Sequence, residues 1–217
     1  MSTLITPVEL AQWQSDGESL FIFDCRSSLM DEAAGKRAYD DAHIPGAQFA
    51  HLSDDLSGPI TPGVTGRHPL PEKDAFVTTL EKWGVTNHSR IVAYDDANGA
   101  FAARLWWMMR WVGHANVTVL EGGLMAWKAA GFATDAAIPQ PVSSQFTPTS
   151  SISKTIDADD LLNSGHFIID ARDQERFEGK VEPIDPIAGH IPGAHCLPFM
   201  QNLTDTMNFK STHELQA

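Results

Sequence analysis

The sequence predicts an α/β fold made of two tandem domains, each with a parallel sheet flanked by helices, of which the second is incomplete. Three observations support this prediction. Short apolar segments alternate with segments of helical spacing, two motifs each occur twice in the same order, and the second copy ends soon after them. Strands of about five residues that alternate with helices are typical of a parallel sheet covered on both faces.

Local signals mark the first elements. A capping box with proline at the first helical position predicts a helix that begins within residues 6–9. Residues 20–23 form a short apolar strand that ends at Asp24 and is followed by a polar loop. The turn at 43–46 leads into a second short strand, and a helix is expected over 71–83.

The alternation continues to the end of each copy. A strand over 90–94 ends at Asp95, and a strand, a turn and a helix follow over 116–130. The second copy begins in the same way, with a helix over 157–162 and a strand over 167–169. Between the strands of the first copy, one face of a helix is predicted by the spacing of Phe101, Leu105, Met108 and Val112.

An internal duplication organises the chain. The segment FIFDCR at 21–26 reappears as FIIDAR at 167–172, and AHIPGA at 42–47 reappears as GHIPGA at 189–194. The offsets are 146 and 147 residues. Two matches in the same order at almost the same spacing indicate the duplication of a whole domain rather than a short solenoid repeat.

The composition between the copies sets the domain boundaries. Residues 133–154 hold three prolines and many serines and threonines with little apolar periodicity, which is typical of an exposed linker. We therefore expect a first domain over 1–134, a linker over 135–154, and the N-terminal part of a second domain over 155–217.

Composition also restricts the partners. The chain has 28 acidic and 15 basic residues and a net charge of −13, so nucleic acid should be repelled. It has no signal-peptide pattern and no stretch near the ~20 apolar residues of a membrane span, which predicts a cytoplasmic protein without a membrane partner. Cys25 and Cys196 fit neither a disulfide framework nor a zinc motif, and no metal or cofactor is implied.

Together the motifs resemble the rhodanese family. The resemblance rests on the duplicated D-x-R and HIPGA motifs, on Tyr94-Asp95 followed by 104–108, and on the strand, turn and helix over 119–127. Tandem rhodaneses of this kind are thiosulfate or 3-mercaptopyruvate sulfurtransferases with an inactive first domain and an active second one. The resemblance therefore implies a small anionic sulfur donor and a thiol or cyanide acceptor.

The family's chemistry needs a cysteine in one particular loop. Its thiolate attacks a sulfane sulfur, holds it as a persulfide and passes it to the acceptor. The cysteine opens a C-x-x-G-x-x loop between a parallel strand and a helix N-terminus, where amides and the helix dipole favour the thiolate. In the first copy this loop spans 95–101 and opens with Asp95, which cannot form a persulfide. We therefore expect the first domain to be inert.

The loop of the second copy is predicted to lie outside the chain. The glycine of the HIPGA turn lies 49 residues before Asp95, and the same spacing in the second copy falls near position 242, beyond Ala217. Cys25 lacks a glycine-rich loop after it, and Cys196 lies in a short apolar segment, so both are interpreted as small buried hydrophobes. No catalytic residue is assigned, and the chain as given is predicted to be inactive.

Part of the second site is still expected within the chain. The resemblance assigns Arg176 to the substrate anion, with Arg172 as a neighbouring candidate, because a guanidinium can hold thiosulfate or carboxylate oxygens in a fork. The first copy has Met30 at the position that matches Arg176. Arg172 has the counterpart Arg26, so both are also interpreted as structural partners of a nearby acid. For Arg176 the alternative is a surface salt bridge.

Other functions stay open at this stage. A non-catalytic rhodanese-fold protein could bind a partner or an anion, whereas a phosphatase on the same fold would need the loop cysteine and therefore ranks last. The sequence does not choose between thiosulfate and 3-mercaptopyruvate. Unpaired strand edges in an incomplete second domain also make self-association possible.

Overall fold

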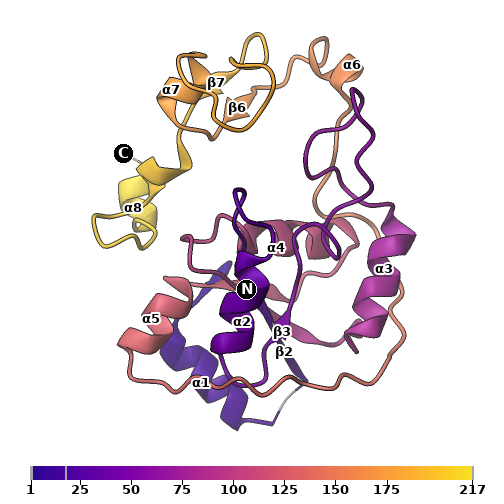
Figure 1. Ribbon diagram of the computed structural model, residues 1–217, viewed down its shortest axis with the longest axis vertical. Coiled ribbons are helices and arrows are strands. Elements are labelled where there is room, and N and C mark those ends of the chain that lie inside the picture. The colour runs from indigo at the N-terminus through magenta and orange to yellow at the C-terminus, as the bar shows by residue number, and fades with distance from the viewer. Residues whose placement is uncertain (1, 18, 217) are drawn as a thin grey trace. The chain divides into compact units, whose positions relative to one another are not determined.

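The computed structural model describes residues 2–17 and 19–216 and divides the chain into two compact units, Met1–Lys154 and Thr155–Ala217. The first unit, coloured indigo to orange in Figure 1, contains a five-stranded, all-parallel sheet. Its strand order is β1-β5-β4-β2-β3. Its strands are β1 (Leu4–Ile5), β2 (Leu20–Asp24), β3 (Gln48–Phe49), β4 (Arg90–Tyr94) and β5 (Val117–Leu120).

Helices cover both faces of this sheet. Along β4, Ile91 and Ala93 point into one apolar cluster and Val92 and Tyr94 into another, as the alternation of a strand requires. Helices α3 and α4 pack on the first cluster, and α1 and α5 on the second. The helices of this unit are α1 (Pro7–Ser15), α2 (Ala34–Asp41), α3 (Lys73–Lys82), α4 (Ala102–Trp111) and α5 (Gly123–Ala129).

Most predicted elements of the first unit are confirmed. The capping box is formed, since the Glu9 carboxylate accepts a hydrogen bond from the Thr6 amide at 2.9 Å and the Thr6 side chain accepts one from the Glu9 amide. The strand over 90–94 has the predicted bounds. On the predicted helix face, Leu105 and Met108 are fully buried.

Helix α2 was not predicted, because the sequence indicated a polar loop in its place. The helix depends on tertiary contacts rather than on apolar periodicity. The Arg26 guanidinium donates to the carbonyls of Ala38 and Ala42 at 3.0 and 2.7 Å, and these groups lie at the C-terminal end of the helix. The Tyr39 hydroxyl donates to the Ala47 carbonyl at 2.8 Å. Neither contact leaves a local signal in the sequence.

The segment over 135–154 is tied to the first unit along its length. Asp135 forms an antiparallel bridge with His43. The Ser144 amide donates to the Glu81 carbonyl at 3.0 Å, and Phe146 is buried in the cluster under α3 and α4. The irregular backbone is therefore ordered by bonds to helices and loops of this unit, although most of its side chains are exposed.

The second unit repeats one strand pair of the first. Strands β6 and β7 are parallel, with Ile169 opposite His195, and β2 and β3 are parallel with Phe23 opposite Gln48. The register therefore preserves the offsets of 146 and 147 residues found in the sequence. The elements are α6 (Ala158–Leu161), β6 (Ile169–Asp170), α7 (Gln174–Phe177), β7 (His195–Cys196), the 3-10 helix η1 (Phe199–Asn202) and α8 (Thr212–Leu215).

Helix length bears on the membrane prediction. Within residues 2–17 and 19–216, no helix is both long enough and apolar enough to span a lipid bilayer. The longest helices, α3 and α4, have ten residues each, about half the length that a span requires.

Candidate functional site

The candidate site lies where β4 ends and α4 begins. Asp95 directly follows the last residue of β4, and the loop over 95–101 leads into the first turn of α4. In an open α/β sheet, the carboxyl ends of parallel strands are the usual place for a ligand site. The helix N-terminus adds unsatisfied amides and a partial positive charge at the same place.

The amides of this loop converge on the Asp95 carboxylate. One carboxylate oxygen accepts hydrogen bonds from the amides of Ala97 and Gly99, both at 2.9 Å. The other accepts from the amides of Phe101 and Ala102, both at 2.8 Å. Asp95 is 1% exposed. We call this set of four amides the amide cradle; in the first unit it is occupied by the loop's own first residue.

Two residues with positive φ shape the amide cradle. Asn98 and Gly99 have φ values of 58° and 87°, so consecutive residues adopt the left-handed region. Such a turn directs successive amides toward one point and forms an anion-binding nest. Glycine and asparagine are the residues that tolerate this conformation best. Asn98 occupies the fourth loop position, where the C-x-x-G-x-x pattern has glycine.

The N-terminus of α5 contacts the backbone of this loop at Asp95. The Leu124 amide donates to the Asp95 carbonyl at 3.0 Å. A Cβ atom on Gly123 would lie 2.1 Å from that carbonyl oxygen, so only glycine fits at this position. The Gly-Gly turn predicted from the sequence therefore brings the α5 N-terminus against the site.

The chemistry of the amide cradle follows from its donors. It can hold a negative group, because four hydrogen bonds and the helix dipole all stabilise an anion. In the first unit that group is a carboxylate, which cannot accept a sulfane sulfur as a persulfide. In the first unit the four donors are therefore already engaged by Asp95.

Neither cysteine is an activated thiol. Cys25 is 2% exposed, and burial raises the pKa of its thiol well above the usual value, with the charge of Asp24 raising it further. Desolvation also raises the pKa of Cys196, and Asp170 adds to the effect. A lowered thiol pKa favours the nucleophilic thiolate, whereas the pKa values of both cysteines are raised.

The two D-x-R motifs form the same clamp in both units. Arg26 donates to both oxygens of Asp24, with the shortest bond at 2.7 Å, and Arg172 does the same to Asp170, with the shortest bond at 2.6 Å. Each guanidinium also donates to the carbonyl just before the histidine of its HIPGA turn, at 2.7 Å in the first unit and 2.6 Å in the second. Both arginines thus fix the turn to the end of a strand, and a substrate-binding role for Arg172 stays a prediction.

Arg176 lies in an ion-pair cluster. It donates to Glu182 at 2.9 Å and to Asp185 at 3.1 Å, and Arg172 reaches the same Glu182 at 3.4 Å. Hydrogen bonds from the Asp185 amide and from Arg176 lower the pKa of Glu182 to about 2. The two candidate arginines are therefore brought together, but through a shared carboxylate. The assignment of Arg176 to a substrate anion stays a prediction.

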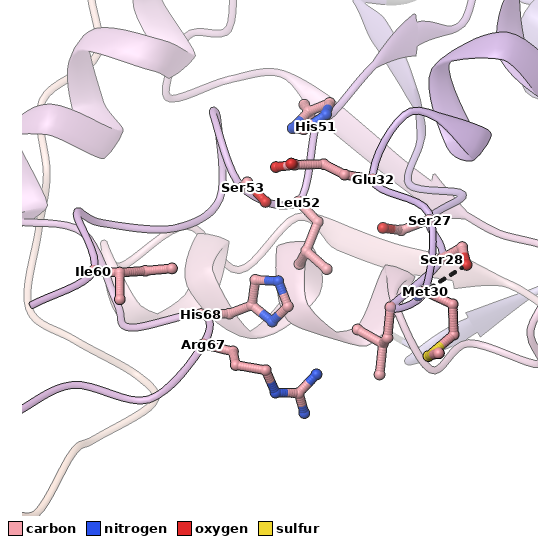
Figure 2. A pocket seen from close by; sticks show the side chains of 11 residues that line it. Ser27, Ser28, Met30, Glu32, His51, Leu52, Ser53, Ile60, Arg67 and His68 are labelled. Carbon is pink, nitrogen blue, oxygen red and sulfur yellow. Dashed lines mark hydrogen bonds between the residues drawn. The ribbon is translucent and has the colours of Figure 1, made fainter. Parts of the chain in front are cut away.

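Sequence reasoning also missed a pocket of about 340 Å³ in the first unit. Figure 2 shows side chains that line it, among them Ser27 and Ser28 from the loop after β2 and His51 and Ser53 from the loop after β3. Burial lowers the pKa of His68, and the charges of Arg104 and Arg67 lower it further. Met30, the counterpart of Arg176, also lines this pocket. The sequence signal for the pocket was the adjacent Arg67-His68 pair in a loop rich in glycine and proline.

The fold and the amide cradle define a class. A parallel sheet covered on both faces, with a strand, an anion-holding loop and a helix at its carboxyl edge, is the architecture expected of a rhodanese-like domain. Residues 6–130 match the family model described as the rhodanese-like domain. The chain belongs to the rhodanese family.

Similar proteins cover almost the whole chain. A probable 3-mercaptopyruvate sulfurtransferase of Pseudomonas aeruginosa is 45% identical over 217 residues, which are 98% of this chain and 76% of that protein. A putative thiosulfate sulfurtransferase, SseB, of Mycobacterium tuberculosis is 39% identical over 99% of this chain and 76% of that protein.

Solved structures show the same fold. The 3-mercaptopyruvate sulfurtransferase from Leishmania major superimposes with a TM-score of 0.81 at 31% identity, over 99% of this chain and 60% of that one. The 3-mercaptopyruvate sulfotransferase SseA from Escherichia coli gives a TM-score of 0.85 at 27% identity, over 100% of this chain and 82% of that one. The chain therefore spans only part of each of these proteins.

Proposed function

We propose that this protein is a sulfurtransferase that moves sulfane sulfur from thiosulfate or 3-mercaptopyruvate to cyanide or a thiol through a cysteine persulfide. The observation that carries the proposal is the amide cradle, a loop built to hold a negative group at a helix N-terminus. The names of the relatives support the same reaction class. The cytoplasmic location expected from the sequence belongs to this proposal.

The two units have different roles in this proposal. The first unit is a rhodanese-like domain in which Asp95 blocks the chemistry. Residues 155–217 are the N-terminal part of a second rhodanese-like domain, which the repeated register of β6 and β7 and the repeated arginine clamp support. The nucleophilic cysteine belongs to the loop of that second domain, near position 242 by the spacing of the first copy.

The reaction divides the work among a few groups. A thiolate attacks the outer sulfur of thiosulfate or the thiol sulfur of 3-mercaptopyruvate, and the cysteine keeps that sulfur as a persulfide. The electron pair of the broken bond leaves with sulfite, or with the pyruvate enolate, which then takes up a proton. The acceptor then attacks the outer sulfur and restores the thiolate. A cradle of amides stabilises the anionic sulfur in both states. Arg176 holds the anionic end of the donor.

The amide cradle should acidify a thiol placed in it. In a Cys25→Ala/Cys196→Ala background, the thiol of an Asp95→Cys variant should have a pKa below the ordinary value of about 8.5, because four amides and a helix end favour the thiolate. The measurement is the pH dependence of alkylation by iodoacetamide, followed by intact mass.

The matched control for this experiment is Asp96→Cys in the same background, since Asp96 is exposed and adjacent. A pKa for the residue-95 thiol equal to or above that of the residue-96 thiol would remove the basis of the proposal. Brief exposure to thiosulfate should add one sulfur atom to the first variant and none to the second.

Arg176 should bind the sulfur donor. A thiosulfate titration monitored by NMR should shift the backbone amides of 174–177 in the wild type, and Arg176→Ala should weaken binding at least about ten-fold, as expected for loss of a hydrogen bond to a charged group. Glu182→Gln should strengthen binding, because it removes the charge of one of the two carboxylates that pair with the guanidinium. Identical titrations of wild type and Arg176→Ala, at an ionic strength fixed with sodium chloride, would refute the assignment.

A further inference from the structure

The second unit has an open pocket beside β6 that the reaction scheme does not use. Its volume is about 380 Å³. Five of its lining residues are Asp170, Arg172, Gly189, His190 and Ile191. By the offsets of the duplication, their counterparts in the first unit are Asp24, Arg26, Ala42, His43 and Ile44. The same five positions therefore line this pocket in one unit and a filled core in the other.

Tyr94 fills the equivalent space in the first unit. It is the last residue of β4 and is fully buried against Ile44. Its hydroxyl donates to Asp24 at 2.7 Å and accepts from the Ile44 amide at 3.2 Å. Its carbonyl accepts from the Cys25 amide at 2.8 Å, where β4 pairs with β2.

The matching hydrogen-bonding groups of the second unit have no partner of this kind among the described residues. The amides of Ala171 and Ile191, the counterparts of Cys25 and Ile44, donate to no acceptor among the described residues. Ile191 is 46% exposed, whereas Ile44 is fully buried. The strand edge of β6 that corresponds to the β4-bearing edge of β2 is likewise unpaired in the described chain.

We propose that the pocket beside β6 is a socket for a tyrosine at the end of a parallel strand that pairs with β6. The occupant is a strand of the kind seen at 90–94, apolar and ending in tyrosine. Its hydroxyl donates to Asp170 and accepts from the Ile191 amide, and its carbonyl accepts from the Ala171 amide. Asp170 can take this bond while it holds Arg172, since Asp24 does both with its own partners.

The socket also has a functional consequence, which rests on the proposed function. In the first unit the residue after the buried tyrosine is Asp95, the first residue of the amide cradle. A strand seated in the socket places its next residue at the matching point of the second unit. That residue is the sulfur carrier, so the tyrosine is a positioning residue for the nucleophile.

The test uses the chain extended after Ala217 by a Gly/Ser linker and a copy of residues 88–96. A linker of about 20 residues has a root-mean-square span of roughly 25 Å and holds the strand at about millimolar effective concentration. Amide hydrogen exchange, followed by NMR, should be slowed at least about ten-fold at Ala171 and Ile191. Replacing the appended tyrosine by phenylalanine should release Ile191 but not Ala171, and replacing it by alanine should release both.

Two results would overturn the inference. One is equal exchange at Ala171 and Ile191 with the tyrosine and alanine forms of the appended strand, which differ only outside the second unit. The other is unchanged protection after Ile191→Arg, which places a charge in the socket; Leu215→Arg, an exposed position outside it, is the control. The readout involves no sulfur chemistry. If exchange at Ala171 and Ile191 is not slowed while the thiol of Asp95→Cys has a lowered pKa, this inference alone is wrong. If exchange is slowed but the thiol pKa is not lowered, the proposed function alone is wrong.

Discussion

Incubated with thiosulfate and cyanide, residues 1–217 should form no thiocyanate above the background of a Cys25→Ser/Cys196→Ser double variant. Turnover requires a thiolate that can reach the donor. Cys25 is buried with a raised pKa, Cys196 has a raised pKa as well, and the amide cradle holds Asp95. We expect the second-order rate constant of thiocyanate formation to equal that of the double variant, not merely to be low.

Thiocyanate is measured through its coloured iron complex. The assay is repeated with 3-mercaptopyruvate as the donor, and pyruvate is then measured as the second product. Far-UV circular dichroism confirms that the double variant is folded. Turnover that disappears with Cys196→Ser alone would refute the prediction and identify the partly exposed cysteine as a nucleophile. Turnover that disappears only with Cys25→Ser would require the first unit to open.

The second large effect concerns stability. Hydrogen exchange should be slow within residues 20–130 and fast beyond about 155. Among the described residues of the second unit only Pro198 and Leu203 are buried, whereas Phe167 is 67% exposed and Ile169 54% exposed. Each large apolar side chain left in water forfeits about 1.5–3 kcal/mol, and a domain is stable by only about 5–15 kcal/mol.

The measurement is exchange followed by mass spectrometry of peptides over a dilution series. Dilution matters because the exposed edge of β6 and its apolar neighbours could be covered by self-association. Protection beyond 155 that disappears on dilution would agree with the prediction and show association. Comparable protection of both units in a dilute monomer would contradict it.

Local signals predicted most of the first unit well. The strand over 90–94 and the helix that starts after Thr6 depend on burial and capping within a few residues, so their sequences are sufficient. Helix α2 was missed because it depends on Arg26, eight or more residues before it, and on a tyrosine bond to a later turn. Contacts at such separations do not alter local periodicity.

The candidate site, like the fold, was predicted only in part. A carboxylate at a helix N-terminus could be predicted at Asp95 from the strand and helix around it. The engagement of both oxygens by four amides could not, because it depends on the left-handed backbone of Asn98 and Gly99. A salt bridge was the alternative predicted for Arg176, but its partner Glu182 could not be named, since the loop between them has no periodic pattern that fixes its path.

In the first unit, the Asp95 carboxylate occupies the anion position that the amides of its own loop form. A loop that carries sulfur must tolerate two occupants in turn, a bare thiolate and a longer persulfide, and its amides must adjust to both. In the first unit both oxygens of one carboxylate engage the four amide donors, and a carboxylate cannot carry sulfur. Under the proposed function this loop exchanges no occupants, so a rigid loop in the first unit costs no turnover and the second domain carries the sulfur.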